Sequence, residues 1–170
     1  EPEDPNAEEH TRQLFTRAEA KLDLFDGRLS QKLGVALTDS RRRDEDLIDS
    51  RDFENADFSH SLAASRFDSQ KRKLDWQGTV KITPEHSLTL GAETETEEAD
   101  TESVFTSYFF GAPSVFSSST LAEARTDAGF VQISSGFFDR LFTMVSLRRD
   151  KHESFPGETT WRVAPASLIR

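Results

Sequence analysis

Apolar side chains recur at every second position over long stretches of this sequence. Between residues 14 and 24 the even positions are apolar or small, whereas the odd positions, apart from Phe15, are charged. An amphipathic helix would instead space its apolar residues three and four positions apart. Because successive side chains of a strand point to opposite faces, this period of two predicts β-strands with one apolar face and one charged face.

The dipeptide Asp26-Gly27 predicts a tight hairpin, because both central residues of a type I′ turn need a positive φ. A two-residue turn at this point sets the register of the strands on either side. It pairs Leu24 with Leu29, Ala20 with Leu33, Ala18 with Val35 and Thr16 with Leu37, all on one face. Gln31 is the exception on that face. A slip of one residue would destroy this agreement, so the pattern favours the hairpin.

The same alternation recurs along the rest of the chain. It predicts seven strands, at about 12–25, 28–38, 71–83, 87–97, 127–137, 140–150 and 159–169. Short turns are expected near 26–27, 84–86 and 138–139, and long polar loops at 39–69 and 98–126. Pro165 is awkward inside the last strand, because proline cannot donate to a strand ladder. Strands joined one after another in this way predict an all-β fold, an antiparallel up-and-down meander.

Strand length favours a membrane barrel. The predicted strands have about 10–14 residues, whereas strands of globular proteins usually have about 5–6. A tilted strand needs about 9–11 residues to cross a bilayer, and outer-membrane barrels have short periplasmic turns and longer extracellular loops. We therefore expect a partial transmembrane β-barrel, with the loops at 39–69 and 98–126 outside the cell.

The alternative is a soluble β-rich domain that binds a ligand or a partner. A sandwich or small barrel with one wet face also shows alternation of apolar and polar residues. In that fold the apolar residues would pack into a closed core formed by Leu29, Leu33, Val35, Val80 and Leu90.

Composition narrows the classes of function. The chain has 170 residues, no cysteine and a net charge of −10. This acidity argues against a nucleic-acid-binding protein, which needs a basic face for phosphates. The four histidines are isolated, and the sequence has no G-x-S-x-G elbow, P-loop or G-x-G-x-x-G motif. We therefore expect that the chain is not an enzyme.

Several strand segments carry a resemblance to a known family. Residues 138–150 begin with FDRL and end with LRRD, and residues 160–164 read TWRVA. Residues 86–93, which read HSLTLGAE, and the strand at 29–39 have a similar pattern. In their order and spacing these segments resemble the barrel of TonB-dependent outer-membrane receptors, nearest to the siderophore and cobalamin types.

That resemblance implies import of a scarce ligand, an iron–siderophore complex or vitamin B12, across the outer membrane of a Gram-negative bacterium. Loops outside would capture the ligand, and a plug inside the barrel would move when the TonB complex pulls it. Barrels of this class have about 22 strands, whereas this sequence shows about seven and has no candidate plug, TonB box or signal peptide. We therefore expect a fragment of a longer receptor. Its partners would be outer-membrane lipid, the ligand, and the TonB complex through a plug that this chain lacks.

The acidic stretch after the second strand is a candidate calcium site. It contains Asp39, Asp44, Glu45, Asp46, Asp49 and Asp52, of which Asp44, Asp46 and Asp49 are the leading candidates. Calcium prefers several carboxylate oxygens from a flexible loop, and the resemblance adds that some cobalamin-type receptors use calcium in outer loops. The alternative is a solvated charged loop, partly neutralised by the arginines at 41–43. No other cofactor is expected.

Two further groups of residues are candidates for contacts. Tyr108, Phe109 and Phe110 could meet an amphipathic ligand from the second long loop, or pack against the loop and the barrel rim. The charged residues expected to face the barrel interior are Glu19, Lys21, Asp75, Lys81, Glu93, Glu95, Arg148 and Asp150. They would contact a plug through charge pairing, or only pair with one another across strands.

Overall fold

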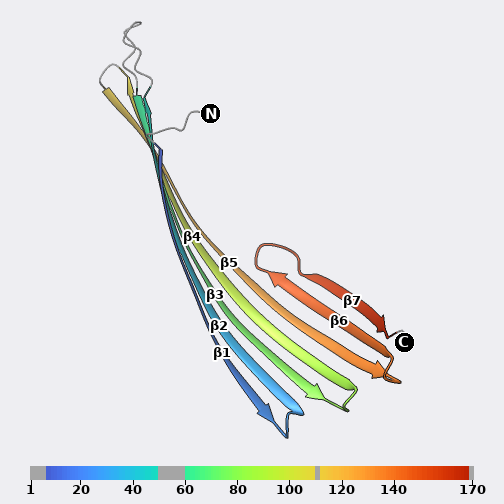
Figure 1. The fold of residues 1–170 in the computed structure, drawn as a ribbon. Coiled ribbons are helices and arrows are strands. Elements are labelled where there is room, and N and C mark those ends of the chain that lie inside the picture. The colour runs from blue at the N-terminus through green and yellow to red at the C-terminus, as the bar shows by residue number, and fades with distance from the viewer. Residues whose placement is uncertain (1–6, 50–59, 110–111, 169–170) are drawn as a thin grey trace. The chain divides into compact units, whose positions relative to one another are not determined.

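Seven strands form one antiparallel sheet in the computed structural model, which describes residues 7–49, 60–109 and 112–168 (Figure 1). The strands are β1 Ala7–Leu24, β2 Leu29–Asp49, β3 His60–Lys81, β4 His86–Phe109, β5 Ala112–Phe137, β6 Leu141–His152 and β7 Glu158–Ser167. Their order in the sheet is their order in the sequence, and the sheet does not close on itself. The predicted all-β meander is therefore confirmed. In the described ranges no helix is long and apolar enough to cross a membrane.

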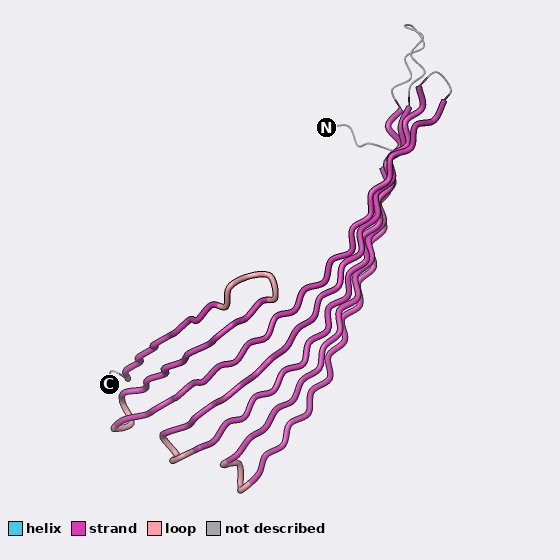
Figure 2. Tube along the Cα trace, turned by 180° about the vertical axis from the view of Figure 1, so that it is seen from behind, coloured by secondary structure: helices cyan, strands magenta, loops and turns pink. Residues whose placement is uncertain are grey.

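Tight turns join β1 to β2, β3 to β4 and β5 to β6 at the same end of the sheet (Figure 2). In the first of them Asp26 and Gly27 have φ angles of 54° and 77°. The N–H of Arg28 donates to the carbonyl oxygen of Phe25 at 3.1 Å. These are the features of the predicted type I′ turn. In the β5–β6 turn the two central positions, 138–139, also have positive φ although neither is glycine.

Apolar side chains share one face of the sheet. Across the β5–β6 ladder the facing pairs are Val131 with Leu147, Ile133 with Val145 and Phe137 with Leu141. On β2, Leu33 and Val35 are 48% and 49% exposed. Among the described residues Ala128 is the buried hydrophobic residue. Among the described residues nothing packs over this face, so they do not form the closed core expected for a soluble sandwich.

The sheet divides into two compact units of contacting residues. The first unit is Glu1–Phe15, Thr38–Gln70 and Glu98–Glu123, and the second is Thr16–Leu37, Lys71–Glu97 and Ala124–Arg170. The three tight turns and the apolar residues named above belong to the second unit. Strands β1 to β5 each contribute residues to both units.

The long loops predicted at 39–69 and 98–126 need correction, because most of their described residues are strand. β2 continues to Asp49 and β3 begins at His60, while β4 continues to Phe109 and β5 begins at Ala112. The sequence pattern missed these strand segments because many side chains are polar on both faces there, and such a strand shows no apolar alternation. No proline or glycine lies between residues 35 and 77, which was the available signal for longer strands.

Pro165 fits β7 because this strand lies at the edge of the sheet. It faces Thr143 in the β6–β7 ladder. Nearby, the N–H of Leu168 donates to the carbonyl oxygen of Arg140 at 2.9 Å. Since ladder bonds alternate along an antiparallel strand, position 165 turns its nitrogen away from β6. The missing N–H therefore removes no bond from this sheet.

Two aromatic rings on the polar face lie against glycines of neighbouring strands. A Cβ placed on Gly91 would be 2.1 Å from the ring of Phe130, and one placed on Gly136 would be 3.4 Å from the ring of Phe142. Gly136 and Phe142 are direct partners in the β5–β6 ladder. Glycine therefore provides the space in which each of these two rings packs against backbone.

Candidate functional site

A lattice of ion pairs covers the polar face of the second unit. Arg17 of β1 binds Asp75 of β3, with Nη1 to Oδ1 at 2.9 Å and Nη2 to Oδ2 at 3.1 Å. These side chains meet across β2 because Gly34 lies beneath them, where a Cβ would be 2.6 Å from each. Lys32 adds an ion pair to Glu19, with Nζ to Oε2 at 2.8 Å. The first branch of the lattice therefore ties three strands together.

A second branch joins β3, β4 and β6. Glu93 of β4 is held by Lys73 of β3 at 2.9 Å and by Arg148 of β6. Arg148 also contacts Asp150 within β6 at 2.7 Å. The pair between Glu93 and Arg148 passes over β5. The small Ala128, the partner of Asp150 in the ladder, is buried on that strand.

The residues predicted to face a barrel interior are thus brought to one face. Ion pairs of the lattice include Glu19, Lys21, Asp75, Glu93, Glu95, Arg148 and Asp150. Lys81 shares their face by alternation from Asp75 along β3. Sequence reasoning did not select their partners Arg17, Lys32 and Lys73. Alternation could have found them, because residues two positions apart on a strand, or opposite each other in a hairpin, share a face. Contact with a plug stays a prediction.

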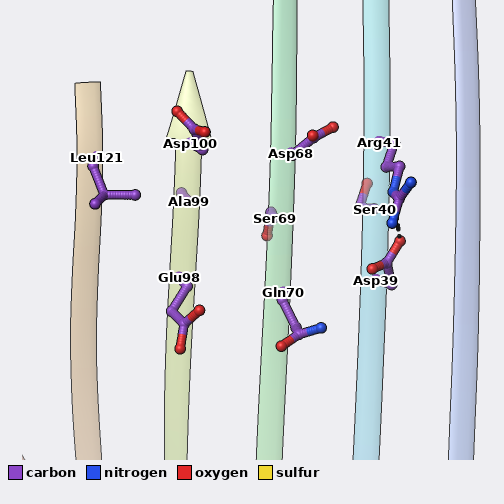
Figure 3. A pocket seen from close by; sticks show the side chains of 10 residues that line it. All are labelled: Asp39, Ser40, Arg41, Asp68, Ser69, Gln70, Glu98, Ala99, Asp100 and Leu121. Carbon is purple, nitrogen blue, oxygen red and sulfur yellow. Dashed lines mark hydrogen bonds and ion pairs between the residues drawn. The ribbon is translucent and has the colours of Figure 1, made fainter. Parts of the chain in front are cut away.

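The first unit carries a hollow of about 220 Å³, shown in Figure 3. Its lining residues are Asp39, Ser40, Arg41, Asp68, Ser69, Gln70, Glu98, Ala99, Asp100 and Leu121. Arg41 and Asp39 form an ion pair along β2, with Nε to Oδ1 at 3.2 Å. The hollow is smaller than the roughly 300–1,000 Å³ of small-molecule sites. It is better described as a charged stretch of surface than as a ligand site.

A second hollow in the same unit is larger, about 380 Å³. Residues from β2, β3, β4 and β5 line it, at 44, 46, 63–65, 103–105 and 116–118. The hydroxyl of Ser65 donates to Oδ2 of Asp44 at 3.1 Å, so these two side chains lie on the same face. This hollow combines two carboxylates with hydroxyl groups and aromatic rings, and its size falls within the range of ligand sites.

Neighbouring charges set the ionisation of side chains in the first unit. The hydrogen bond from Arg66 lowers the pKa of the Asp68 carboxyl below its ordinary value, and the charges of Arg66, Arg41 and Arg43 act in the same direction. The guanidinium of Arg42 is held by Asp44 at 2.9 Å, which raises the pKa of Arg42. Asp68 and Arg42 are therefore charged at neutral pH.

The predicted aromatic contacts lie at the end of β4. Tyr108 is partly exposed and already has an interaction within the protein. Phe109 is the last residue of β4, but its side chain and the whole of Phe110 lie outside the described residues. Their role as ligand contacts therefore stays a prediction.

The calcium candidates are only partly described. Asp44 is held by Arg42 and Ser65, and Asp46 lines the larger hollow beside it. The side chain of Asp49 and the whole of Asp52 lie outside the described residues. Among the residues that are described, no three histidine, aspartate or glutamate side chains are grouped as metal ligands. Calcium binding stays a prediction.

Comparison with known proteins shows what fold this sheet shares. No family model and no curated protein matches the sequence. A RagAB peptide importer in its open-open state matches with a TM-score of 0.69, at 15% identity over 94% of this chain. BauA, the ferric preacinetobactin receptor from Acinetobacter baumannii, matches with a TM-score of 0.54, at 12% identity over 94% of this chain.

The sheet has the fold of a section of these proteins. It spans 19% of the RagAB chain and 28% of the BauA chain. At such low identity the likeness concerns the path of the backbone, not the ligand or the residues that bind it.

Proposed function

We propose that this chain is part of the wall of an outer-membrane transport barrel of the TonB-dependent receptor type. The observation that carries the proposal is the one-sided sheet of the second unit, whose apolar side chains are exposed on one face while ion pairs cover the other. Soluble monomers rarely expose an apolar patch larger than about 600 Å². In an outer membrane, lipid covers the apolar face, and the charged face lines the barrel interior.

The edges of the sheet support the same proposal. β1 and β7 are the two edge strands, and each has a row of backbone groups without a partner in this sheet. In a bilayer an unpaired backbone group costs several kcal/mol, so spanning sheets close into barrels. We therefore propose that further strands pair with β1 and β7. The solved structures that share the fold have longer chains than this one.

We further propose which ligand the barrel imports. BauA is a receptor for ferric preacinetobactin, and RagAB imports peptides. Together with the resemblance of the strand segments, the first of these favours an iron–siderophore complex as the cargo, and vitamin B12 is the alternative. A plug that the TonB complex moves would contact the charged face near Glu93 and Arg148. The proposal assigns transport to the chain and no catalytic step.

The test uses the full-length protein that contains this sequence. Membrane fractionation is expected to recover the protein in the outer membrane, resistant to alkaline extraction. Spin labels are then attached to Val35→Cys and Ala36→Cys, two neighbours on opposite faces of β2 in the second unit. Because lipid covers only the apolar face, the label at 35 should collide with dissolved oxygen and be shielded from a water-soluble nickel chelate. The label at 36 should show the reverse preference.

The matched pair makes the result independent of how deep the strand lies in the bilayer. A fully soluble protein, or equal access of the nickel chelate to both labels, would contradict the proposed membrane wall.

A further inference from the structure

The larger hollow of the first unit has two chemically different sides. Its acidic side is formed by Asp44 and Asp46, two positions apart on β2 and therefore on one face of the strand. Its apolar side is formed by Phe105 of β4 and Phe116 of β5, which are 40% and 66% exposed. A site with a carboxylate at one end and exposed rings at the other suits a molecule with one cationic and one apolar part.

The two carboxylates differ in how far the protein compensates their charge. Asp44 is bound by Arg42, with Nε at 2.9 Å from both carboxylate oxygens, and by the hydroxyl of Ser65. Asp46 is partly exposed, but its Oδ1 is shielded from solvent and has no hydrogen-bond partner among the described residues. Shielding a polar atom from water without such a partner is unfavourable. A cation bound in the hollow would supply a partner for this oxygen.

Two other hollows of the described residues differ from this one. The hollow in Figure 3 is smaller, and its lining includes the ion pair between Arg41 and Asp39 but no aromatic ring. A hollow of about 430 Å³ in the second unit includes Val35, Leu37 and Leu74 of the apolar face. Lipid chains would fill that one under the proposed function.

We propose that the hollow between Asp46 and the rings of Phe105 and Phe116 binds a protonated amine that carries an apolar group. The ammonium group lies against the carboxylate of Asp46, and the apolar group lies on the two rings. The cationic end can also gain attraction from a ring face. The inference deepens the proposed function by naming a class of ligand, but binding at this hollow can be measured without transport.

The test measures binding of three fluorescent probes to the full-length protein in lipid nanodiscs. Dansylcadaverine carries an ammonium group, dansylamide is its neutral counterpart and dansylglycine is anionic. Binding is followed by anisotropy, with empty nanodiscs as the reference for partition into lipid. Because the hollow offers a carboxylate and apolar rings, dansylcadaverine should bind at least about fivefold more tightly than dansylamide, and dansylglycine least tightly.

Matched variants assign this preference to the hollow. Asp46→Asn keeps the size of the side chain and removes its charge, so it should abolish the preference for the cation. Asp46→Glu restores the charge and should keep the preference. Asp100→Asn removes a carboxylate of the same unit that lines the other hollow, and should change nothing. Phe116→Ala should weaken both the cationic and the neutral probe.

Each outcome bears on the hollow itself. Equal affinity for the cationic and neutral probes overturns the inference, and so does equal weakening by Asp46→Asn and Asp100→Asn, which would indicate general attraction to an acidic protein. A negative binding result would not contradict the proposed membrane wall, because the spin-label test concerns the second unit. A soluble protein that binds dansylcadaverine through Asp46 would overturn the proposed function and keep this inference.

Discussion

A single polar residue on the apolar face has a partner that is distant in the sequence. Gln31 interrupts the apolar positions of β2, and its Oε1 accepts a hydrogen bond from the indole Nε1 of Trp76 at 2.6 Å. Gly78 provides the space for this contact, because a Cβ there would be 2.8 Å from the ring of Trp76. The two polar groups therefore satisfy each other where no water is expected. Alternation alone identified Gln31 as an exception but not its partner, which is 45 residues away.

Charge at Asp68 is expected to stabilise the first unit in a pH-dependent way. Because Arg66 lowers the pKa of Asp68 in the folded protein, the stabilisation is complete above the ordinary carboxylate pKa and is lost as pH falls through the lowered value. Asp68→Asn should therefore speed hydrogen exchange of β2 and β3 amides at neutral pH. Relative to the parent protein, the difference should shrink in strong acid.

Glu123→Gln serves as the control for Asp68→Asn, because it removes an exposed carboxylate at the margin of the same unit. It should leave the exchange of β2 and β3 unchanged. An effect of Asp68→Asn that is the same at neutral and strongly acidic pH would mean that shape, not charge, is responsible.

At the scale of elements, two hairpins use the same turn geometry with different residues. The β1–β2 turn has Asp26 and Gly27 at its centre, and the β5–β6 turn has Phe138 and Asp139, with φ angles of 55° and 53°. In both turns an N–H donates across the turn at 3.1 Å. A left-handed conformation costs a non-glycine residue about 1–2 kcal/mol. Gly27 avoids this cost at one position of the first turn, but Phe25 and Asp26 carry it there, as Phe138 and Asp139 do in the second turn.

Replacing Asp139 with glycine is expected to stabilise the protein. The change relieves the left-handed conformation at this position, although glycine also makes the unfolded chain more flexible, so the net gain should be about 0.5–1 kcal/mol. The measurement is the free energy of unfolding by urea in lipid vesicles.

Gly27→Ala, the reverse change in the other turn, is the comparison and should destabilise the protein by a similar amount. Stabilisation by both substitutions would show that turn conformation does not control these hairpins.

At the scale of the whole molecule, the sheet has an apolar face that no other part of the described residues covers. Both tryptophans of the chain, Trp76 and Trp161, lie on this face and are 38% and 76% exposed. Trp161 is paired with Leu147 across the ladder, so it continues the apolar row to the edge strand. If lipid covers this face, both indole rings lie in the hydrocarbon region or at its border.

Quenching by brominated lipids tests that arrangement. In vesicles of brominated phospholipid, replacing Trp76 or Trp161 with phenylalanine should each remove a strongly quenched component of the fluorescence. The matched control moves the ring to the next position, with Trp76→Phe combined with Gln77→Trp. Because residue 77 lies on the polar face, its fluorescence should be quenched far less. Equal quenching at 76 and 77 would count against a lipid-covered face.

Sequence alone determined the alternation of faces, the two-residue hairpin at Asp26-Gly27 and the order of the strands, because these depend on neighbouring residues and on a fixed period of two. It also selected the charged residues of the polar face. It did not show how far the strands extend, since β2 to β5 continue through stretches whose two faces are both polar.

Tertiary structure decided which side chains meet across intervening strands. Arg17 reaches Asp75 over Gly34, and Arg148 reaches Glu93 over β5. It also brought Asp46 of β2 and Phe116 of β5 to the same hollow. Such contacts depend on the register of several ladders at once and on small residues that leave space between them. A pattern read along one strand contains neither kind of information.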